Sequence, residues 1–448
     1  MFKLAISGGI IIGKRFSVCR DERFLALVEV LRSADATFGH LEGTICDPHA
    51  PEVYPAAEAG WTWIRMPPRF AEELVWAGYN ILSHASNHCL DYMYGGLYET
   101  WKALQEAGLP YAGTGRNLRE ARRPAYFDAG NRRVALVSSS SSTTDWARAA
   151  DGKGDDGGRP GANQIRMIYR VDEQTAQTVR DLAVKMGWWL TEVDDDLMLN
   201  PPGLHNTVFR FTVSREPGFS GVSAMADPAD VAANLASIRE AKQRADFVVF
   251  HIHNHEWDPA AGLSHPPEFI RRLARDCIDA GADVFVAEGA HALLRGIEIY
   301  RGKPIFYDPG DLFKDGNSKI RPLSEYYWMR GRSEETDKWH VITVEAAGFA
   351  EKQKLPVPVH PPGGYNTGKV LAVIVPVCEF DDEGRLRQIR IHPATHLSGT
   401  FGLRGLPGLE SGEEARKIID YLGELSEPFG TRIEFDNGTG LIRVEPEA

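Results

Sequence analysis

The sequence predicts a layered α/β fold, and three observations carry the prediction. Short apolar runs alternate with amphipathic segments through the first part of the chain, as strands and helices do when they follow one another. The alternation returns after residue 223, and glycines such as Gly78 and Gly108 stand where the first helices must stop. With 43% apolar residues, the 448-residue chain can also bury a substantial core.

The elements of the first part follow from their residue patterns. Short apolar runs predict strands at residues 4–6, 36–38, 80–83 and 134–138. Apolar residues at three- and four-residue spacing predict helices at 24–32, 68–77 and 94–107.

The middle of the chain is less regular. Residues 143–161 are rich in Gly, Asp and Arg without periodicity, which predicts an exposed loop. Residues 163–223 mix a helical pattern at 172–186 with a strand pattern at 207–213, so we interpret this stretch as an insertion.

The α/β pattern then resumes. It predicts a helix ending near 245, a strand at 247–252, a helix at 267–280 and strands at 283–287 and 304–307. The final elements are paired strands at 370–380 and 386–391, a helix at 412–425 and a hairpin of 432–435 with 440–444.

Composition excludes several functional classes. The 50 basic and 62 acidic residues give a net charge of -12, which argues against general binding of nucleic acid or of an anionic membrane. The five cysteines are scattered and form no CxxC pair, so neither a disulfide framework nor a zinc ribbon is expected. Without a signal-peptide pattern or an apolar span of membrane length, we expect a cytoplasmic protein with no membrane segment.

Three histidines and a carboxylate are concentrated where one apolar strand ends. Asp246–Phe250 reads as a buried strand, and His251, His253, His255 and Glu256 follow it. Imidazole with carboxylate is the usual ligand set for borderline divalent metals. Any one of these histidines can instead simply cap the strand, but the cluster as a whole favours metal or acid–base chemistry.

Similar polar clusters follow three other predicted strands. Their carboxyl ends can meet at one edge of a sheet, where α/β proteins place their chemistry. The four clusters are at residues 39–43, 83–91, 251–257 and 288–291.

These motifs resemble those of the CapA-like proteins, a family of the calcineurin-like metallophosphatase superfamily named for poly-γ-glutamate capsule synthesis. The segment Ser86–Tyr92, with Gly113–Asn117 after it, resembles the hallmark of the family. Gly39–Glu42 is similar to its Asn-Leu-Glu strand end, and His253 with Glu256 and Trp257 to its His-Trp-Gly-x-Glu-Tyr motif. The resemblance covers residues 1 to about 315 and part of the tail.

The resemblance implies a four-layer α/β/β/α metallophosphatase-like sandwich with metals at the strand ends. We expect a main domain at 1–325, interrupted by an insertion at about 143–225, and a C-terminal extension at 326–448 that packs on it. Carried over by position, the implied metal ligands are His40, Glu42, Asn87, His253, Glu288 and His291. His88 would protonate the leaving group, with Asp91 and Glu256 as the further catalytic candidates and His251 and His255 as supporting groups.

The chain also departs from the family pattern. Where the family has a strand ending in Gly-Asp, this chain has Gly8-Gly9, so one carboxylate ligand is missing. Glu288 stands where the family has a histidine, and His40 replaces the family asparagine. We therefore expect one retained metal or an altered pair.

The leading functional hypothesis is a metal-dependent hydrolase that uses a metal-activated water. It would hold one or two divalent ions (Mn, Zn or Fe) and cleave an amide, ester or phosphoester bond in a small-molecule or peptide-like substrate. The alternatives are a non-catalytic partner in polymer synthesis or export, which the loss at Gly9 favours, and metal-free acid–base catalysis by His88. The sequence does not fix the oligomeric state.

Overall fold

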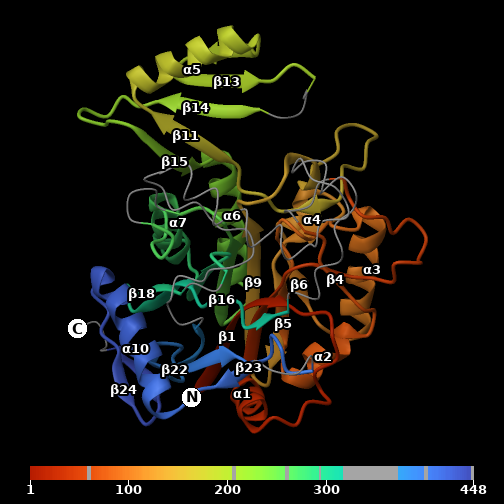
Figure 1. The fold of residues 1–448 in the computed structure, drawn as a ribbon, viewed down its shortest axis with the longest axis vertical. Helices are drawn as coiled ribbons and strands as arrows, with labels where there is room; N and C mark the ends of the chain where they lie inside the picture. The colour runs from red at the N-terminus through yellow and green to blue at the C-terminus, as the bar shows by residue number, and fades with distance from the viewer. Residues whose placement is uncertain are drawn as a thin grey trace, which may run out of the picture.

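A computed structural model of the chain describes residues 1–57, 62–203, 208–257, 262–291, 294–315, 372–397 and 402–444. Within these residues two large β-sheets pack face to face, and helices cover both outer faces (Figure 1). The predicted four-layer α/β/β/α sandwich is confirmed.

The first sheet combines strands from both ends of the chain. Its central strand β1 (Phe2–Ile11) runs parallel to β2 (Ala36–Leu41) and antiparallel to β21 (Ala372–Phe380). Beyond these lie β5 (Ile81–Ser83) and β6 (Tyr111–Ala112) on one side, and β22 (Leu386–His396), β25 (Thr439–Arg443) and β24 (Glu434–Asp436) on the other. Short strands β20 (Phe313–Lys314) and β23 (Pro407–Leu409) pair with β1 and β22.

The second sheet is built from the middle of the chain. Its order is β18 (Arg295–Tyr300), β19 (Lys303–Asp308), β17 (Val284–Glu288), β16 (Phe247–His253), β9 (Arg132–Ser140) and β8 (Ala125–Ala129). Strands β9, β16 and β17 run parallel, so their carboxyl ends lie at one edge of the sheet.

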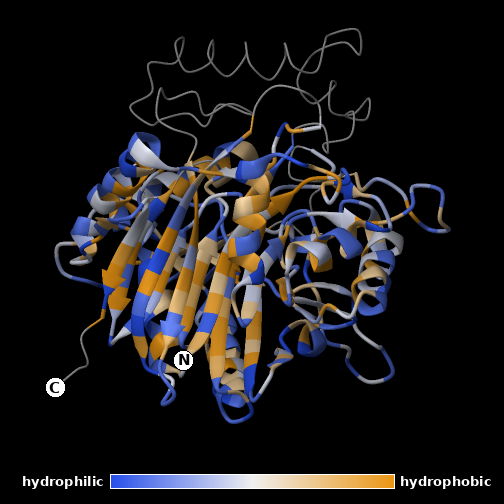
Figure 2. Ribbon diagram, turned by 90° about the horizontal axis from the view of Figure 1, so that it is seen from below, coloured by the Kyte–Doolittle hydropathy of each residue, from blue (hydrophilic) through white to orange (hydrophobic). Residues whose placement is uncertain are grey.

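The main core lies between the two sheets. Phe38 and Ile81 of the first sheet pack there with Leu136, Val249 and Val286 of the second, and all are almost fully buried. Seen from below, the strands carry apolar residues along much of their length (Figure 2). Burial of this apolar surface is the main stabilising contribution to the sandwich.

Amphipathic helices close the outer faces. Helices α1 (Glu22–Arg32), α2 (Phe70–Ala77) and α3 (Met93–Glu106) contribute to the core outside the first sheet. Helices α6 (Pro228–Lys242) and α7 (Glu268–Asp279) cover the second sheet, and α10 (Gly412–Ser426) packs on β18 and β22. The minor elements are β3 (Thr44–Ile45), β4 (Arg65–Met66), β7 (Thr114–Gly115), β10 (Gly161–Ala162) and α4 (Leu118–Ala121).

A separate small sheet forms within the predicted insertion. It contains β12 (Trp189–Val193), β13 (Asp196–Asn200), β14 (Phe209–Val213), β11 (Met167–Val171) and β15 (Val222–Ala226), with α5 (Glu173–Met186) packed on it. In Figure 1 it lies at the top, at one end of the molecule. We call residues 167–226 the small module.

The C-terminal strands are part of the first sheet. Strand β21 is hydrogen-bonded to β1 along residues 2–5, so β21 and β22 continue the sheet and do not merely pack against it. The predicted domain boundaries stay predictions, and residues 326–371 lie outside the described part of the chain. Among the described residues no helix is both long and apolar enough to cross a membrane.

Candidate metal centre

The inner faces of five strands change from apolar to polar at the same end of the sandwich. Side chains two residues apart on a strand share a face, so each polar residue follows a core residue on the intersheet side. The pairs are Phe38 and His40, Ile81 and Ser83, Leu136 and Ser138, Val249 and His251, and Val286 and Glu288. His253 extends this pattern on β16. The core therefore ends in a buried polar cluster, as the sequence predicted.

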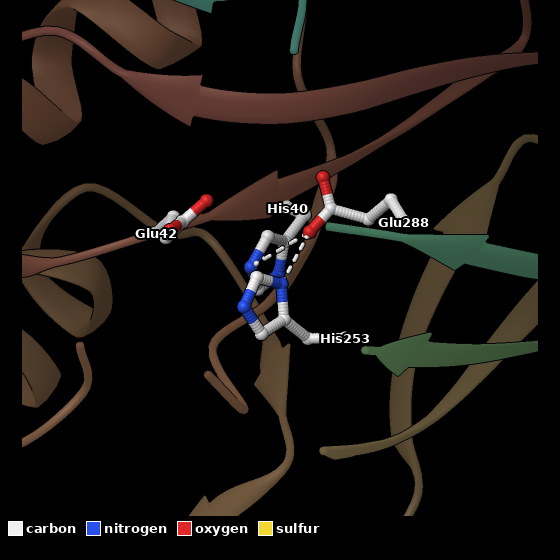
Figure 3. A group of neighbouring side chains, drawn as sticks. All are labelled: His40, Glu42, His253 and Glu288. Carbon is white, nitrogen blue, oxygen red and sulfur yellow. Dashed lines mark hydrogen bonds and ion pairs between the residues drawn. The ribbon is translucent and has the colours of Figure 1, made fainter. Parts of the chain in front are cut away.

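His40, Glu42, His253 and Glu288 form the centre of this cluster. All four are fully buried, and each offers a ligand atom within 4.8 Å of those of the other three. Glu288 Oε1 lies 2.7 Å from His253 Nδ1 and 3.2 Å from His40 Nε2. Figure 3 shows both imidazoles facing the Glu288 carboxylate, with Glu42 across from them.

Three more side chains extend the cluster toward the surface. Asn87 Oδ1 and His255 Nε2 each lie 2.9 Å from His253 Nε2. His291 Nε2 lies 3.9 Å from Glu42 Oε1, and Glu42, His255 and His291 form a second group with ligand-atom spacing. His255 and His291 are partly exposed, so this side of the cluster faces outward.

Several buried polar atoms in this cluster have no hydrogen-bond partner among the described residues. They are both carboxylate oxygens of Glu42 and Glu288 Oε2. A buried polar atom without a partner is costly and rare in native proteins. A divalent cation would satisfy these atoms, because imidazole nitrogen and carboxylate oxygen are its usual ligands.

The electrostatics of the cluster point the same way. Burial, together with the carboxylates of Glu42, Asp311 and Asp308, raises the pKa of Glu288 well above its ordinary value. Burial also lowers the pKa of His40 and of His253 well below the ordinary value, so both imidazoles are neutral at neutral pH. Neutral imidazole is the form that binds metal, and a cation beside Glu288 would stabilise its ionised form. The residues present therefore fit a divalent metal.

His88 and Asp91 form a pair at the margin of the cluster. His88 Nδ1 lies 2.7 Å from Asp91 Oδ2, and the same oxygen accepts a hydrogen bond of 2.6 Å from the backbone N–H of Ile64. His88 Nε2 lies 3.8 Å from Glu42 Oε1. Asp91 therefore holds the imidazole with Nε2 toward the metal centre.

Ser83 connects two imidazoles beneath the cluster. Its Oγ lies 3.1 Å from His40 Nδ1, 2.8 Å from His251 Nδ1 and 2.6 Å from Ser138 Oγ. The ring of His251 stacks on that of His40 at 4.6 Å, and burial lowers the pKa of His251 to about 3. His251 therefore supports His40 from below and does not belong to the group of ligand atoms.

Glu256 lies outside the cluster. Its carboxylate accepts hydrogen bonds from Ser141 Oγ at 2.8 Å and Ser142 Oγ at 3.2 Å. Ser142 Oγ in turn accepts from the His255 backbone N–H, so Glu256 fixes the loop that carries His255. The other predicted site residues, from His40 to His291, converge within or beside the cluster.

The sequence interpretation missed two residues beside the cluster, Asp311 and Lys314. Asp311 is 1% exposed, and its Oδ2 lies 3.1 Å from His291 Nδ1 and 2.5 Å from Lys314 Nζ. Both belong to the segment after the predicted strand at 304–307. Their position depends on the pairing of β20 with β1, which no local pattern signals.

The fold and the cluster at its strand ends define the protein as an α/β sandwich with a candidate metal centre. Within that class, the chain belongs to the family described as bacterial capsule synthesis protein PGA_cap, whose family model matches residues 14–316. The predicted CapA-like resemblance is thereby confirmed.

Three bacterial relatives show how far the likeness extends. An uncharacterized protein of Sinorhizobium fredii is 32% identical over 451 residues, which cover 99% of this chain and 93% of the relative. A "Probable polyglutamine synthesis accessory protein" of Mycobacterium tuberculosis is 30% identical over 53% of this chain and 45% of its own length. The "PGA biosynthesis protein CapA" of Bacillus subtilis is 32% identical over 30% of each chain.

Proposed function

We propose that the protein is a metal-dependent hydrolase of the CapA-like family. The observation that carries the proposal is the buried cluster of His40, Glu42, His253 and Glu288, in which carboxylate oxygens have no hydrogen-bond partner. The proposed bond is an amide, ester or phosphoester in a small or peptide-like substrate. The names of the relatives support a role in the metabolism of a polymer of the poly-γ-glutamate type.

The proposed metal ligands are drawn from the cluster and its outward extension. They are His40, Glu42, Asn87, His253, Glu288 and His291. Their mixed nitrogen and oxygen donors suit one or two ions of Mn, Zn or Fe. A divalent cation there would supply Lewis acidity, lowering the pKa of a water molecule and polarising the bond to be cleaved.

His88 is the proposed proton-transfer residue. Asp91 accepts a hydrogen bond from Nδ1–H, which fixes the orientation of the ring. Nε2 is left facing the cluster, where it can exchange a proton with a substrate atom. His255 and His291 stand on the partly exposed side, where a substrate would enter, and can orient its polar groups.

Metal quantification tests the proposal. Protein purified from medium supplemented with Mn, Zn and Fe is expected to retain stoichiometric metal, and His253→Ala and Asn87→Ala are expected to lose it. His392→Ala is the matched control, because His392 is a half-buried imidazole on β22 outside both ligand groups. A wild type that retains no metal would sink the proposal.

Turnover is the second measurement. Chromogenic phosphate mono- and diesters, an aryl ester and a γ-glutamyl anilide sample the three bond classes. Product release that disappears when a chelator is added and returns when metal is added back supports the proposed metal-dependent hydrolase. Release that resists chelator supports metal-free acid–base catalysis by His88 instead.

A non-catalytic role in polymer synthesis or export is the second candidate. It is favoured by Gly9, which offers no carboxylate at the carboxyl half of β1. It predicts that wild-type protein binds metal yet cleaves none of the probes, and detectable turnover by the wild type would reject it.

A further inference from the structure

Gly9 faces two carboxylates across the metal centre. It pairs with His40 in the register of β1 and β2, beyond a bulge that follows Ile6. A Cβ atom at residue 9 would lie 2.6 Å from Asp311 Oδ1 and 2.9 Å from Glu288 Oε2, closer than real Cβ contacts come. The space that a side chain at residue 9 would fill is therefore already taken by these two carboxylate oxygens.

The carboxylate of Asp311 is held in a defined orientation. Lys314 Nζ lies 2.5 Å from Oδ2, and His291 Nδ1 lies 3.1 Å from the same oxygen. The backbone carbonyl of Asp311 also accepts a 2.8 Å hydrogen bond from His396 Nε2, which ties this segment to β22. Among the described residues, Oδ1 has one long contact, 3.4 Å to His291 Nδ1, and it is the oxygen turned toward Gly9.

The charges around Gly9 are predominantly negative. Glu42, Glu288 and Asp311 are each 1% exposed or less. Among the described residues, Lys314 is the one lysine or arginine that forms an ion pair with any of the three, and its pair is with Asp311 Oδ2. Glu288 Oε2, which faces Gly9, is buried and has no hydrogen-bond partner within the described residues. Buried carboxylates in excess require a cation or a proton.

We infer that Asp311 is a further metal-holding residue and that its Oδ1 acts with Glu288 Oε2 in the space beside Gly9. The carboxylate that β1 lacks is thus supplied from the segment between β19 and β20. Gly9 makes this possible, because any side chain there would displace both oxygens. The inference rests on the proposed function, since it requires a metal in the cluster.

An exchange of positions tests the inference without reference to turnover. Metal content and affinity are measured by competition with a chelator for wild type, Asp311→Asn, Asp311→Ala, Gly9→Asp and the double variant Gly9→Asp/Asp311→Ala. Asp311→Asn and Asp311→Ala are expected to lower affinity at least about tenfold. Gly9→Asp is expected to lower it as well, because the new carboxylate collides with Asp311. The double variant is expected to bind metal more tightly than Gly9→Asp, since the carboxylate at residue 9 no longer competes with Asp311 for the space.

Asp315→Asn is the matched control, because Asp315 is an equally buried carboxylate of the same segment that pairs with Lys14. It is expected to bind metal as the wild type does. Asp311→Asn, which keeps the size of the side chain, separates loss of charge from loss of packing, and far-UV circular dichroism verifies folding.

The outcomes separate the two proposals. Wild type without metal overturns both the proposed function and this inference. Wild type and Asp311→Asn with equal affinity, while His253→Ala loses metal, overturn the inference alone. A double variant no better than Gly9→Asp also overturns it, because Asp311 then does not share the space.

Discussion

At the scale of single residues, the orientation of His40 depends on one hydroxyl group. Ser83 Oγ contacts His40 Nδ1, so a proton on Nδ1 is shared with Ser83 and the lone pair of Nε2 is directed at Glu288 and the metal centre. Ser83→Ala removes this partner without adding volume. We expect metal affinity to fall about 10- to 100-fold, with the fold retained.

Ser139→Ala is the matched control for Ser83→Ala. Ser139 is also fully buried, but its hydroxyl has no hydrogen-bond partner among the described residues. Chelator competition on both variants decides the point. Equal affinity of Ser83→Ala and wild type would show that Ser83 does not orient the ligand.

Buried imidazoles also set the pH dependence of stability. Burial lowers the pKa of His84 to about 4 and that of His251 to about 3, against 6.5 in the unfolded chain. Below pH 6.5 the unfolded state binds protons that the folded state does not, so each group lowers the free energy of unfolding by about 1.4 kcal/mol per pH unit as pH falls. This loss extends down to the folded pKa. Glu288, whose pKa is raised, contributes with the opposite sign.

The contribution of His251 is isolated by comparing variants. Urea unfolding of chelator-treated wild type and His251→Gln is measured on either side of pH 6.5. As pH falls below 6.5, the unfolding free energy of the variant is expected to decrease less steeply than that of the wild type. The difference in slope corresponds to about one bound proton. His49→Gln, at an exposed position, serves as control. Parallel slopes for wild type and His251→Gln would contradict the prediction.

The sequence predicted most of the site at this scale but not its completion. His40, His253 and Glu288 lie at the ends of predicted strands, whose carboxyl ends were expected to meet at one edge of a sheet. The family resemblance added Asn87, which lies in the loop after β5. Asp311 could not be recognised in this way. Its approach to Gly9 depends on β20 pairing with β1 across some 300 residues of sequence, and that tertiary contact leaves no local pattern.

At the scale of elements, the two glycines of β1 allow another segment to approach. The sequence predicted a strand at 4–6, whereas β1 continues through both glycines to Ile11. A Cβ at residue 8 would lie 1.8 Å from the carbonyl oxygen of Gly310, which is an impossible distance. The apolar pattern of β1 is interrupted before the strand ends, because the close approach of Gly310 requires a glycine at residue 8.

Replacing Gly8 should therefore destabilise the fold. Gly8→Ala forces β1 away from the segment around Gly310, and we expect a loss of more than about 2 kcal/mol in unfolding free energy. Gly423→Ala is the control. It lies within α10 with no atom near the added Cβ, and it should stabilise the protein by about 0.5–1 kcal/mol. Urea unfolding of both variants measures the difference, and a Gly8→Ala variant as stable as wild type would refute the close approach.

The other elements were predicted more accurately where their residues are regularly buried. Strands such as β16 and β17, buried on both faces, gave continuous apolar runs and were located to within a few residues. Strand β12, exposed at the edge of the small module, and β15, with little alternation, were missed. Their pairing is fixed by neighbouring strands rather than by their own composition.

At the scale of the whole molecule, the two parts predicted as additions to the main domain are attached in different ways. The small module has its own core, and its ends are adjacent: Met167 pairs with Ala226, and the Asp227 backbone N–H donates a 2.8 Å hydrogen bond to the Arg166 carbonyl. The C-terminal strands β21 and β22 instead cover the edge of β1 and contribute to the main core.

Deleting each part should therefore have opposite effects. Joining Arg166 to Asp227 through an Asn-Gly turn removes the small module, yet leaves both main sheets and the metal ligands intact, so we expect a folded protein that retains metal. Ending the chain after residue 315 removes β21 and β22, which exposes the β1 edge and the intersheet core, so we expect aggregation or proteolysis during expression. Thermal unfolding, protease resistance and metal content are measured for the two shortened chains and for the full chain. A truncated chain that folds and holds metal would show that the sandwich does not need its C-terminal strands, whereas an unfolded deletion of the small module would show that the second sheet depends on that module for its stability.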